Sequence, residues 1–185
     1  VSGIRAHALW WVPEGSESGW GLNIAHHGFI GTLFATWFTY DANGQPTWLV
    51  MSNGAKQADG SYQGDLFRVQ GTPFNSPTWA LPSATTSVGT MKLAFTSNNT
   101  ATLTYSVNGT MVTKAITRQT FGPVPLCTFG AQVNLALTNN YQDLWWAAPA
   151  GSEAGWGINL THEGDTIFVT WFTYDVDHTP MWMVA

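Results

Sequence analysis

Apolar and polar residues alternate along most of this chain with a period of two, the pattern of β-strands that bury one face. Turn signals such as Asn53-Gly54, Asp59-Gly60 and Asn108-Gly109 separate the alternating segments. No convincing helical period interrupts them up to residue 121. The pattern predicts strands near residues 8–12, 19–27, 32–40, 46–52, 61–70, 88–97, 100–107 and 110–121.

Asn108-Gly109 gives the most specific turn prediction, because both residues tolerate the positive φ that a type I′ hairpin requires. Consecutive strands joined by short links close most readily into an antiparallel up-and-down barrel. The sequence therefore predicts an all-β fold, with a first unit that is a barrel of about eight strands.

The chain also repeats itself. Residues 9–28 and 32–50 align with residues 144–164 and 166–184, and more than half of the aligned positions are identical. Both copies contain GSE, GWG and TWFTYD, and of the 11 tryptophans all except Trp79 lie within the copies. We expect the second copy to form the same strands as the first.

The second copy stops after the equivalent of the first four strands. We predict a complete barrel repeat over residues 1–121, a linker rich in proline and glycine over 122–131, and a partial repeat of about four strands over 132–185. Open sheet edges recruit other strands. We expect the half repeat to pack on the barrel, to pair with a second copy about a two-fold axis, or to continue into further sequence.

The motif series WW, SESGWGLN, TWFTYD and PTWLV resembles a repeat in secreted bacterial proteins of unassigned function, and it covers nearly the whole chain. This resemblance implies secretion and repetition but no activity. The predicted strand count and order resemble an avidin- or lipocalin-type barrel, although no ligand motif of those families matches residue by residue.

Charged residues make up 9% of the chain, against about 25% in typical soluble domains. Because such a composition is common in extracellular β-proteins, we expect a secreted, extracellular or periplasmic location. The six Lys and Arg residues all precede residue 119 and form no visible basic patch, which argues against a nucleic-acid partner. No apolar run reaches the roughly 20 residues of a membrane-spanning helix. The single Cys127 either pairs outside this segment or is a buried thiol.

The tryptophans are the strongest candidates for a binding site. Any one of them can be explained as core, but five in each repeat exceed what a small barrel comfortably buries. Surplus rings suggest a stacking platform for sugars or an apolar pocket inside the barrel. With the recurrent polar residues added, the candidate ligand-binding residues are Trp11, Glu17, Trp20, Asn23, His26, Trp37, Trp48, Trp146, Glu153, Trp156, Asn159, His162, Trp171 and Trp182.

Glu17 and Glu153 precede GWG in both copies. Each carboxylate either accepts backbone N–H bonds and shapes a loop, or serves as a general acid or a partner of a sugar hydroxyl. His26 and His162 recur at the end of an apolar strand face, either as satisfied core residues or as ligand-binding ones.

No metal or cofactor is expected, because a metal site needs three or four convergent donors and each repeat offers one recurrent histidine. Asp175 and Asp177 have the spacing of calcium ligands, but the loop lacks the glycine and the distal glutamate of an EF-hand.

The leading hypothesis is a secreted, non-catalytic binding or adhesion module for a glycan or a small apolar ligand. One alternative is a self-assembling extracellular protein, a homo-oligomer joined through residues 132–185 or Cys127, in which another chain completes the half repeat. The other is a hydrolase that uses Glu17 and His26.

Overall fold

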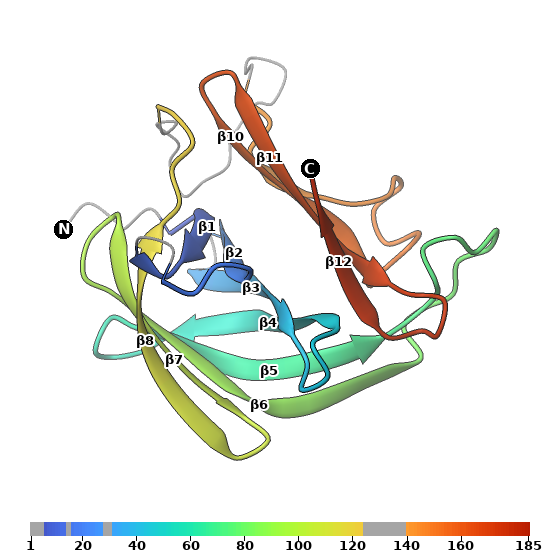
Figure 1. The fold of residues 1–185 in the computed structure, drawn as a ribbon, viewed down its shortest axis with the longest axis horizontal. Coiled ribbons are helices and arrows are strands. Elements are labelled where there is room, and N and C mark those ends of the chain that lie inside the picture. Colours follow the sequence, from blue (N-terminus) through green and yellow to red (C-terminus); the bar gives the residue numbers. More distant parts are fainter. Residues whose placement is uncertain (1–5, 14–15, 28–30, 124–139) are drawn as a thin grey trace.

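A computed structural model of the 185-residue chain describes residues 6–13, 16–27, 31–123 and 140–185. Its first eight strands form a closed antiparallel barrel in which each strand pairs with the next and β1 pairs with β8 (Figure 1). This confirms the predicted all-β fold. The barrel strands are β1 (Ala8–Trp11), β2 (Gly21–His27), β3 (Thr32–Tyr40), β4 (Pro46–Lys56), β5 (Tyr62–Gln70), β6 (Ala84–Phe95), β7 (Thr100–Val107) and β8 (Thr110–Arg118).

Two turns follow the sequence closely. Asn108 and Gly109 have φ angles of 49° and 84° and join β7 to β8, which confirms the predicted hairpin. Gly19 and Gly155, the first glycines of the two GWG motifs, have φ angles of 107° and 110°. Because residues other than glycine rarely adopt such backbone angles, both copies need glycine where the chain turns into β2 or β10.

The second copy forms a separate four-stranded sheet in the order β12-β11-β10-β9. Its register repeats that of the barrel: Leu22 lies opposite Trp37 between β2 and β3, and Ile158 lies opposite Trp171 between β10 and β11. The sheet is therefore half a barrel with the same strand pairing. Its strands are β9 (Asp143–Trp145), β10 (Gly157–Glu163), β11 (Thr166–Tyr174) and β12 (Pro180–Val184).

Side chains fill the barrel interior. The inward-facing residues of all eight strands form one buried cluster, in which Trp10 is fully inaccessible to solvent. The alternation noted in the sequence is thus the alternation between this interior and the outer face of the barrel. The largest members of the cluster are Trp10, Trp37, Tyr62, Met51, Met91, Leu22, Leu33, Leu66, Leu93 and Leu103.

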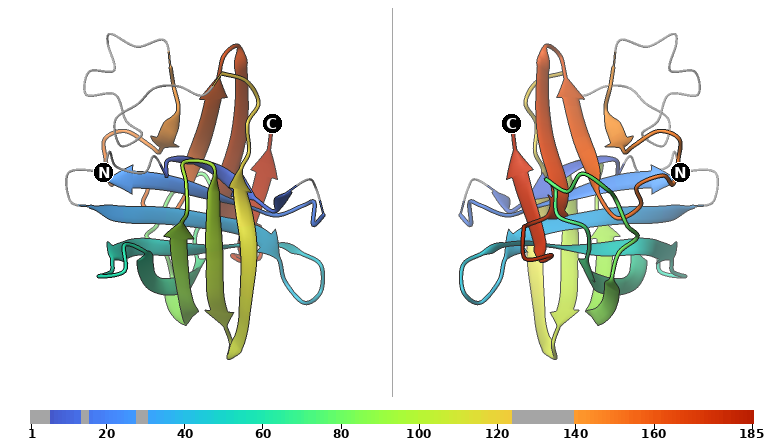
Figure 2. Two further views of the ribbon diagram at one scale, coloured as in Figure 1. Left: turned by 90° about the vertical axis from the view of Figure 1, so that its left-hand side faces the viewer. Right: turned by 90° about the vertical axis from the view of Figure 1, so that its right-hand side faces the viewer.

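The second sheet packs across the outside of the barrel, over the face formed by β2 to β5 (Figure 2). A second apolar cluster fills this interface. The predicted linker lies mostly outside the described residues, and so does Cys127. In the part of the chain that the structure describes, no helix has the length and apolar character needed to cross a membrane.

Candidate functional site

The outward faces of the two repeats meet at this interface. In both TWFTYD segments Trp points to one side of the strand and the following Phe to the other. Trp37 packs in the barrel interior, whereas Phe38 lies on the outside, with its ring centroid 6.5 Å from that of Phe172. Phe38 and Phe172 are equivalent positions of the repeat, so each copy presents the same surface to the other.

The hydrogen bonds across the interface are reciprocal. Trp48 Nε1 donates to the backbone carbonyl of Thr173 at 2.8 Å, and Trp182 Nε1 donates to that of Thr39, also at 2.8 Å. Trp48 corresponds to Trp182, and Thr39 corresponds to Thr173. The two repeats are therefore related by an approximate two-fold axis, as in an isologous dimer interface.

Aromatic contacts follow the same rule. The ring of Trp48 lies 5.1 Å from Phe172 and 5.7 Å from Tyr174. The ring of Trp182 lies 6.0 Å from Phe38, the equivalent of Phe172, and 5.6 Å from Tyr40, the equivalent of Tyr174. All of these distances lie within the range in which aromatic pairs stabilise a fold.

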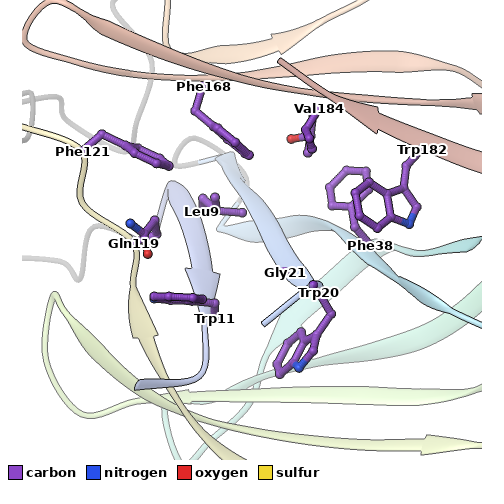
Figure 3. A pocket seen from close by; sticks show the side chains of 12 residues that line it. Leu9, Trp11, Trp20, Gly21, Phe38, Gln119, Phe121, Phe168, Trp182 and Val184 are labelled. Atoms are coloured by element: carbon purple, nitrogen blue, oxygen red, sulfur yellow. The ribbon is translucent and has the colours of Figure 1, made fainter. Parts of the chain in front are cut away.

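A cavity of about 340 Å³ opens beside the two-fold axis, between the outer face of β1 to β3 and the facing side of β11 and β12 (Figure 3). We call it the first pocket. Aromatic rings approach it from both repeats, with Trp11 on the barrel side and Phe168 and Trp182 on the other. Its lining residues are Leu9, Trp11, Gly19, Trp20, Gly21, Phe38, Gln119, Phe121, Phe168, Thr170, Trp182 and Val184.

A second pocket of about 380 Å³ lies on the other side of the axis. Most of its lining occupies the repeat positions that line the first pocket, with the roles of the two copies exchanged. The equivalent pairs are Leu9 and Leu144, Trp11 and Trp146, Gly19 and Gly155, Trp20 and Trp156, Phe38 and Phe172, Phe168 and Phe34, Trp182 and Trp48, and Val184 and Val50.

Both pockets offer an apolar environment with little hydrogen-bonding capacity. Gln119 and Thr170 provide the polar side chains of the first pocket, and Ser52 and Glu153 provide those of the second. Pockets with this balance of apolar walls and few polar groups are typical of sites for small apolar molecules. Both lie outside the barrel wall, and not inside the barrel where the sequence suggested a pocket.

Each of the two glutamates accepts a hydrogen bond from a tryptophan. Glu17 accepts a hydrogen bond from Trp20 Nε1 at 3.1 Å, and Glu153 accepts one from Trp156 Nε1 at 2.9 Å. Glu17 also forms an ion pair with Lys114 of β8. The hydrogen bond from Lys114, followed by that from Trp20, lowers the pKa of the Glu17 carboxyl.

The recurrent histidines lie away from both pockets. His26 is buried near the end of β2, where its Nε2 lies 3.4 Å from the Tyr62 hydroxyl. His162 stacks on Tyr141, with ring centroids 5.7 Å apart. Glu17 precedes the start of the same strand that ends near His26, so the structure does not bring them together.

The two asparagines lie at the interface. Asn23 Nδ2 donates to the hydroxyl of Thr170 in the other repeat. The equivalent bond would join Asn159 to Thr36, but Asn159 Nδ2 and Thr36 Oγ1 are buried without a partner. The two-fold relationship is therefore approximate at this pair.

Among the described residues, no group of three or more His, Cys, Asp or Glu side chains could hold a metal ion. Asp175 and Asp177 accept hydrogen bonds from their own loop, from Val176 N at 2.6 Å and Thr179 N at 3.0 Å. They shape the turn that links β11 to β12.

Of the predicted site residues, the structure places Trp11, Trp20 and Trp182 in the first pocket, and Trp48, Trp146, Glu153 and Trp156 in the second. The outward apolar residues that complete each pocket were not among the predicted site residues. The sequence did contain one indication of them. An apolar residue such as Leu9 or Phe38 on the outer side of a barrel strand would be exposed unless another element packs over it. The missed residues that recur in both copies are Leu9, Leu144, Phe34, Phe168, Phe38, Phe172, Val50 and Val184.

Comparison with known proteins finds no protein-family model, no curated protein and no solved structure that matches this chain. The equivalence of positions therefore comes from the internal repeat of the chain itself.

Proposed function

We propose that this protein is a non-catalytic binding module for small apolar ligands, which it holds in two equivalent pockets between its repeats. The observation that supports the proposal is the recurrence of the lining. Trp11 and Trp146, the second tryptophans of the two WW motifs, are not needed inside a barrel, and each forms a wall of one pocket.

The chemistry of the lining favours an apolar ligand over a glycan. A sugar needs several hydrogen-bonding partners, and the first pocket provides the side chains of Gln119 and Thr170. An aromatic ligand that buries about 150–250 Å² of its surface gains on the order of 4–6 kcal/mol from that burial. Before the entropic cost of association, a gain of this size corresponds to dissociation constants of roughly tens of micromolar to one millimolar.

A fluorescence titration tests the proposal. The probe is N-phenyl-1-naphthylamine, a neutral aromatic dye whose emission rises in apolar surroundings. Trp11→Ala should weaken binding to the first pocket about tenfold and leave the second unchanged, and Trp146→Ala should do the reverse. A titration that neither substitution alters would contradict the proposal.

A secreted or periplasmic location is part of this proposal. The small share of charged residues and the reliance on uncharged polar residues for solubility support it. Fractionation of cells that express the natural gene would test it, because recovery of the protein from the cytosol alone would contradict an extracellular role.

A second candidate function is self-assembly through the half barrel, and the exposure of equivalent residues favours it. Trp10 is 0% exposed inside the barrel, whereas its equivalent Trp145 is 40% exposed; Leu33 is 0% exposed and its equivalent Ile167 is 42%. The face that the closed barrel buries is thus open in β9 to β12, a feature of surfaces that bind other proteins. Sedimentation at rising concentration tests this candidate, and a strictly monomeric mass would contradict it.

The third hypothesis, a hydrolase that uses Glu17 and His26, gains no support from the geometry. A shared mechanism requires both groups near one substrate, and they lie toward opposite ends of β2. Equal turnover of an oligosaccharide panel by the parent protein and Glu17→Gln would remove Glu17 from any mechanism.

A further inference from the structure

In the barrel, one carboxylate and one tryptophan ring together bind the ammonium group of a lysine from the same chain. Lys114 of β8 forms an ion pair with Glu17, and its Nζ lies 5.6 Å from the centroid of the Trp20 ring. Glu17 also holds that ring through the indole N–H. A carboxylate and an aromatic face together thus bind one ammonium group, which is a favourable arrangement for a cation.

The second repeat contains the same carboxylate and ring. Glu153 holds Trp156 through the indole N–H at 2.9 Å, as Glu17 holds Trp20. Among the described residues, the sheet formed by β9 to β12 includes no strand equivalent to β8, which carries Lys114 in the first repeat. The described part of the chain contains two lysine–carboxylate ion pairs, Lys92–Asp59 and Lys114–Glu17. Neither involves Glu153, so no described lysine or arginine pairs with it.

A cavity of about 140 Å³ lies at this position, and Glu153 and Trp156 form part of its lining. The segment between β5 and β6 closes it from the barrel side. Trp79 reaches over from that segment, donates its indole N–H to the carbonyl of Ala154 at 3.1 Å, and places its ring 6.2 Å from that of Trp156.

Further aromatic rings complete the enclosure. Trp171 lies 6.4 Å from Trp156, and Phe74 lies 6.3 Å from Trp171, each in an edge-to-face arrangement. Thr173 is 1% exposed, lines the same cavity, and its hydroxyl has no hydrogen-bond partner. The cavity thus combines several aromatic rings, one carboxylate and one buried hydroxyl oxygen that can accept a hydrogen bond.

We propose that this cavity binds a primary alkylammonium group, which pairs with Glu153 and lies against the ring of Trp156. The ligand takes the place that Lys114 occupies in the first repeat. Its N–H groups donate to the carboxylate and to Thr173, and the aromatic rings stabilise its charge. The source is either a free amine or the side chain of a lysine on another molecule.

This inference does not rest on the apolar-ligand proposal, although Glu153 and Trp156 line both cavities. The apolar pocket takes a neutral molecule between the repeats, and the ammonium cavity takes a cation under the segment that carries Trp79. The dye titration and an ammonium titration can therefore fail independently.

The test follows the indole N–H signals of the 185-residue chain by NMR while n-butylammonium chloride is added, with sodium chloride at matched ionic strength as the reference. A second arm uses Nα-acetyl-lysine N-methylamide, to distinguish a lysine side chain from a free amine. We expect saturable shifts of the Trp156 signal with at least one probe. n-Butanol, the neutral analogue, should produce none.

Matched variants sharpen the result. Glu153→Gln should weaken ammonium binding about tenfold, because the pairing charge is lost while the shape is kept. Glu17→Gln should leave it unchanged, since Glu17 does not line the ammonium cavity. Absence of a saturable Trp156 shift with both probes, or equal binding by Glu153→Gln, would overturn the proposal.

Discussion

Trp48 and Trp182 occupy the same position in the two repeats, and each donates its indole N–H to the carbonyl of the equivalent threonine across the interface, both at 2.8 Å. An accidental contact between a barrel and a loose sheet would not produce such a matched pair. The half repeat is therefore docked through a defined, approximately two-fold surface, and this surface creates both apolar pockets.

Removing either indole N–H should destabilise the docked arrangement. We expect Trp48→Phe and Trp182→Phe each to lower the free energy of unfolding by about 1–2 kcal/mol, because a carbonyl loses its partner. Trp48→Phe should have the larger effect, since Trp48 is buried and Trp182 is half-buried. Urea denaturation measures both, and equal stability of either variant and the parent would contradict the role of that bond.

The asparagine pair tests how far the symmetry extends. Asn23 bonds Thr170, whereas Asn159 Nδ2 is buried without a partner. We expect Asn23→Ala to cost about 1 kcal/mol more than Asn159→Ala in urea denaturation, because only the first substitution breaks a bond and leaves a buried hydroxyl unpaired. Equal costs would show that the two sides are equivalent in solution.

The two WW motifs should respond differently to truncation. Trp10→Ala opens a cavity in the barrel core and should cost about 3–5 kcal/mol. Trp145→Ala removes a ring that is 40% exposed on the open face of the half barrel and should cost below about 1 kcal/mol. Thermal or urea unfolding of the full chain measures both. A large cost at Trp145 would indicate that this face is covered in solution, as the self-assembly candidate requires.

Stability should fall in mildly acidic solution because of His7. Its pKa is lowered from 6.5 to about 4. Burial is the main cause; Asp143 opposes it by raising the pKa, and Arg118 lowers the pKa by a smaller amount. The unfolded chain therefore binds a proton more readily between these values, so the stabilisation is fully present above pH 6.5 and is lost as the pH falls toward 4. The loss approaches about 3 kcal/mol.

Urea denaturation across this pH range, with His7→Gln for comparison, measures the effect. The variant should show a flatter dependence on pH. A parent protein with the same pH dependence as the variant would exclude His7 as the cause.

Alternation predicted the barrel strands because each strand buries one face, and Asn108-Gly109 predicted a hairpin whose residues accept positive φ. The turn predicted at Asn53-Gly54 was wrong, because both residues lie within β4 and Gly54 pairs with Leu33 of β3. The repeat likewise predicted the strands of the second sheet. The pockets could not be predicted in the same way. They depend on which outer face of the barrel the second sheet covers, and Phe38 shows no sign in the sequence of its contact with Phe172.

The role of Glu17 was equally hidden. Its partner Lys114 lies 97 residues away along the chain, on the strand that closes the barrel. Within the described ranges no lysine takes the equivalent position beside Glu153, and this difference is visible only when the two sites are compared in three dimensions.

The decisive experiment on the two pockets is a crystal structure of the chain with 1-bromonaphthalene, because anomalous scattering locates each bromine atom. We expect two bromine positions on opposite sides of the two-fold axis, one between Trp11 and Trp182 and the other between Trp146 and Trp48. Bromine bound inside the barrel, at unrelated surface sites or not at all would contradict this expectation.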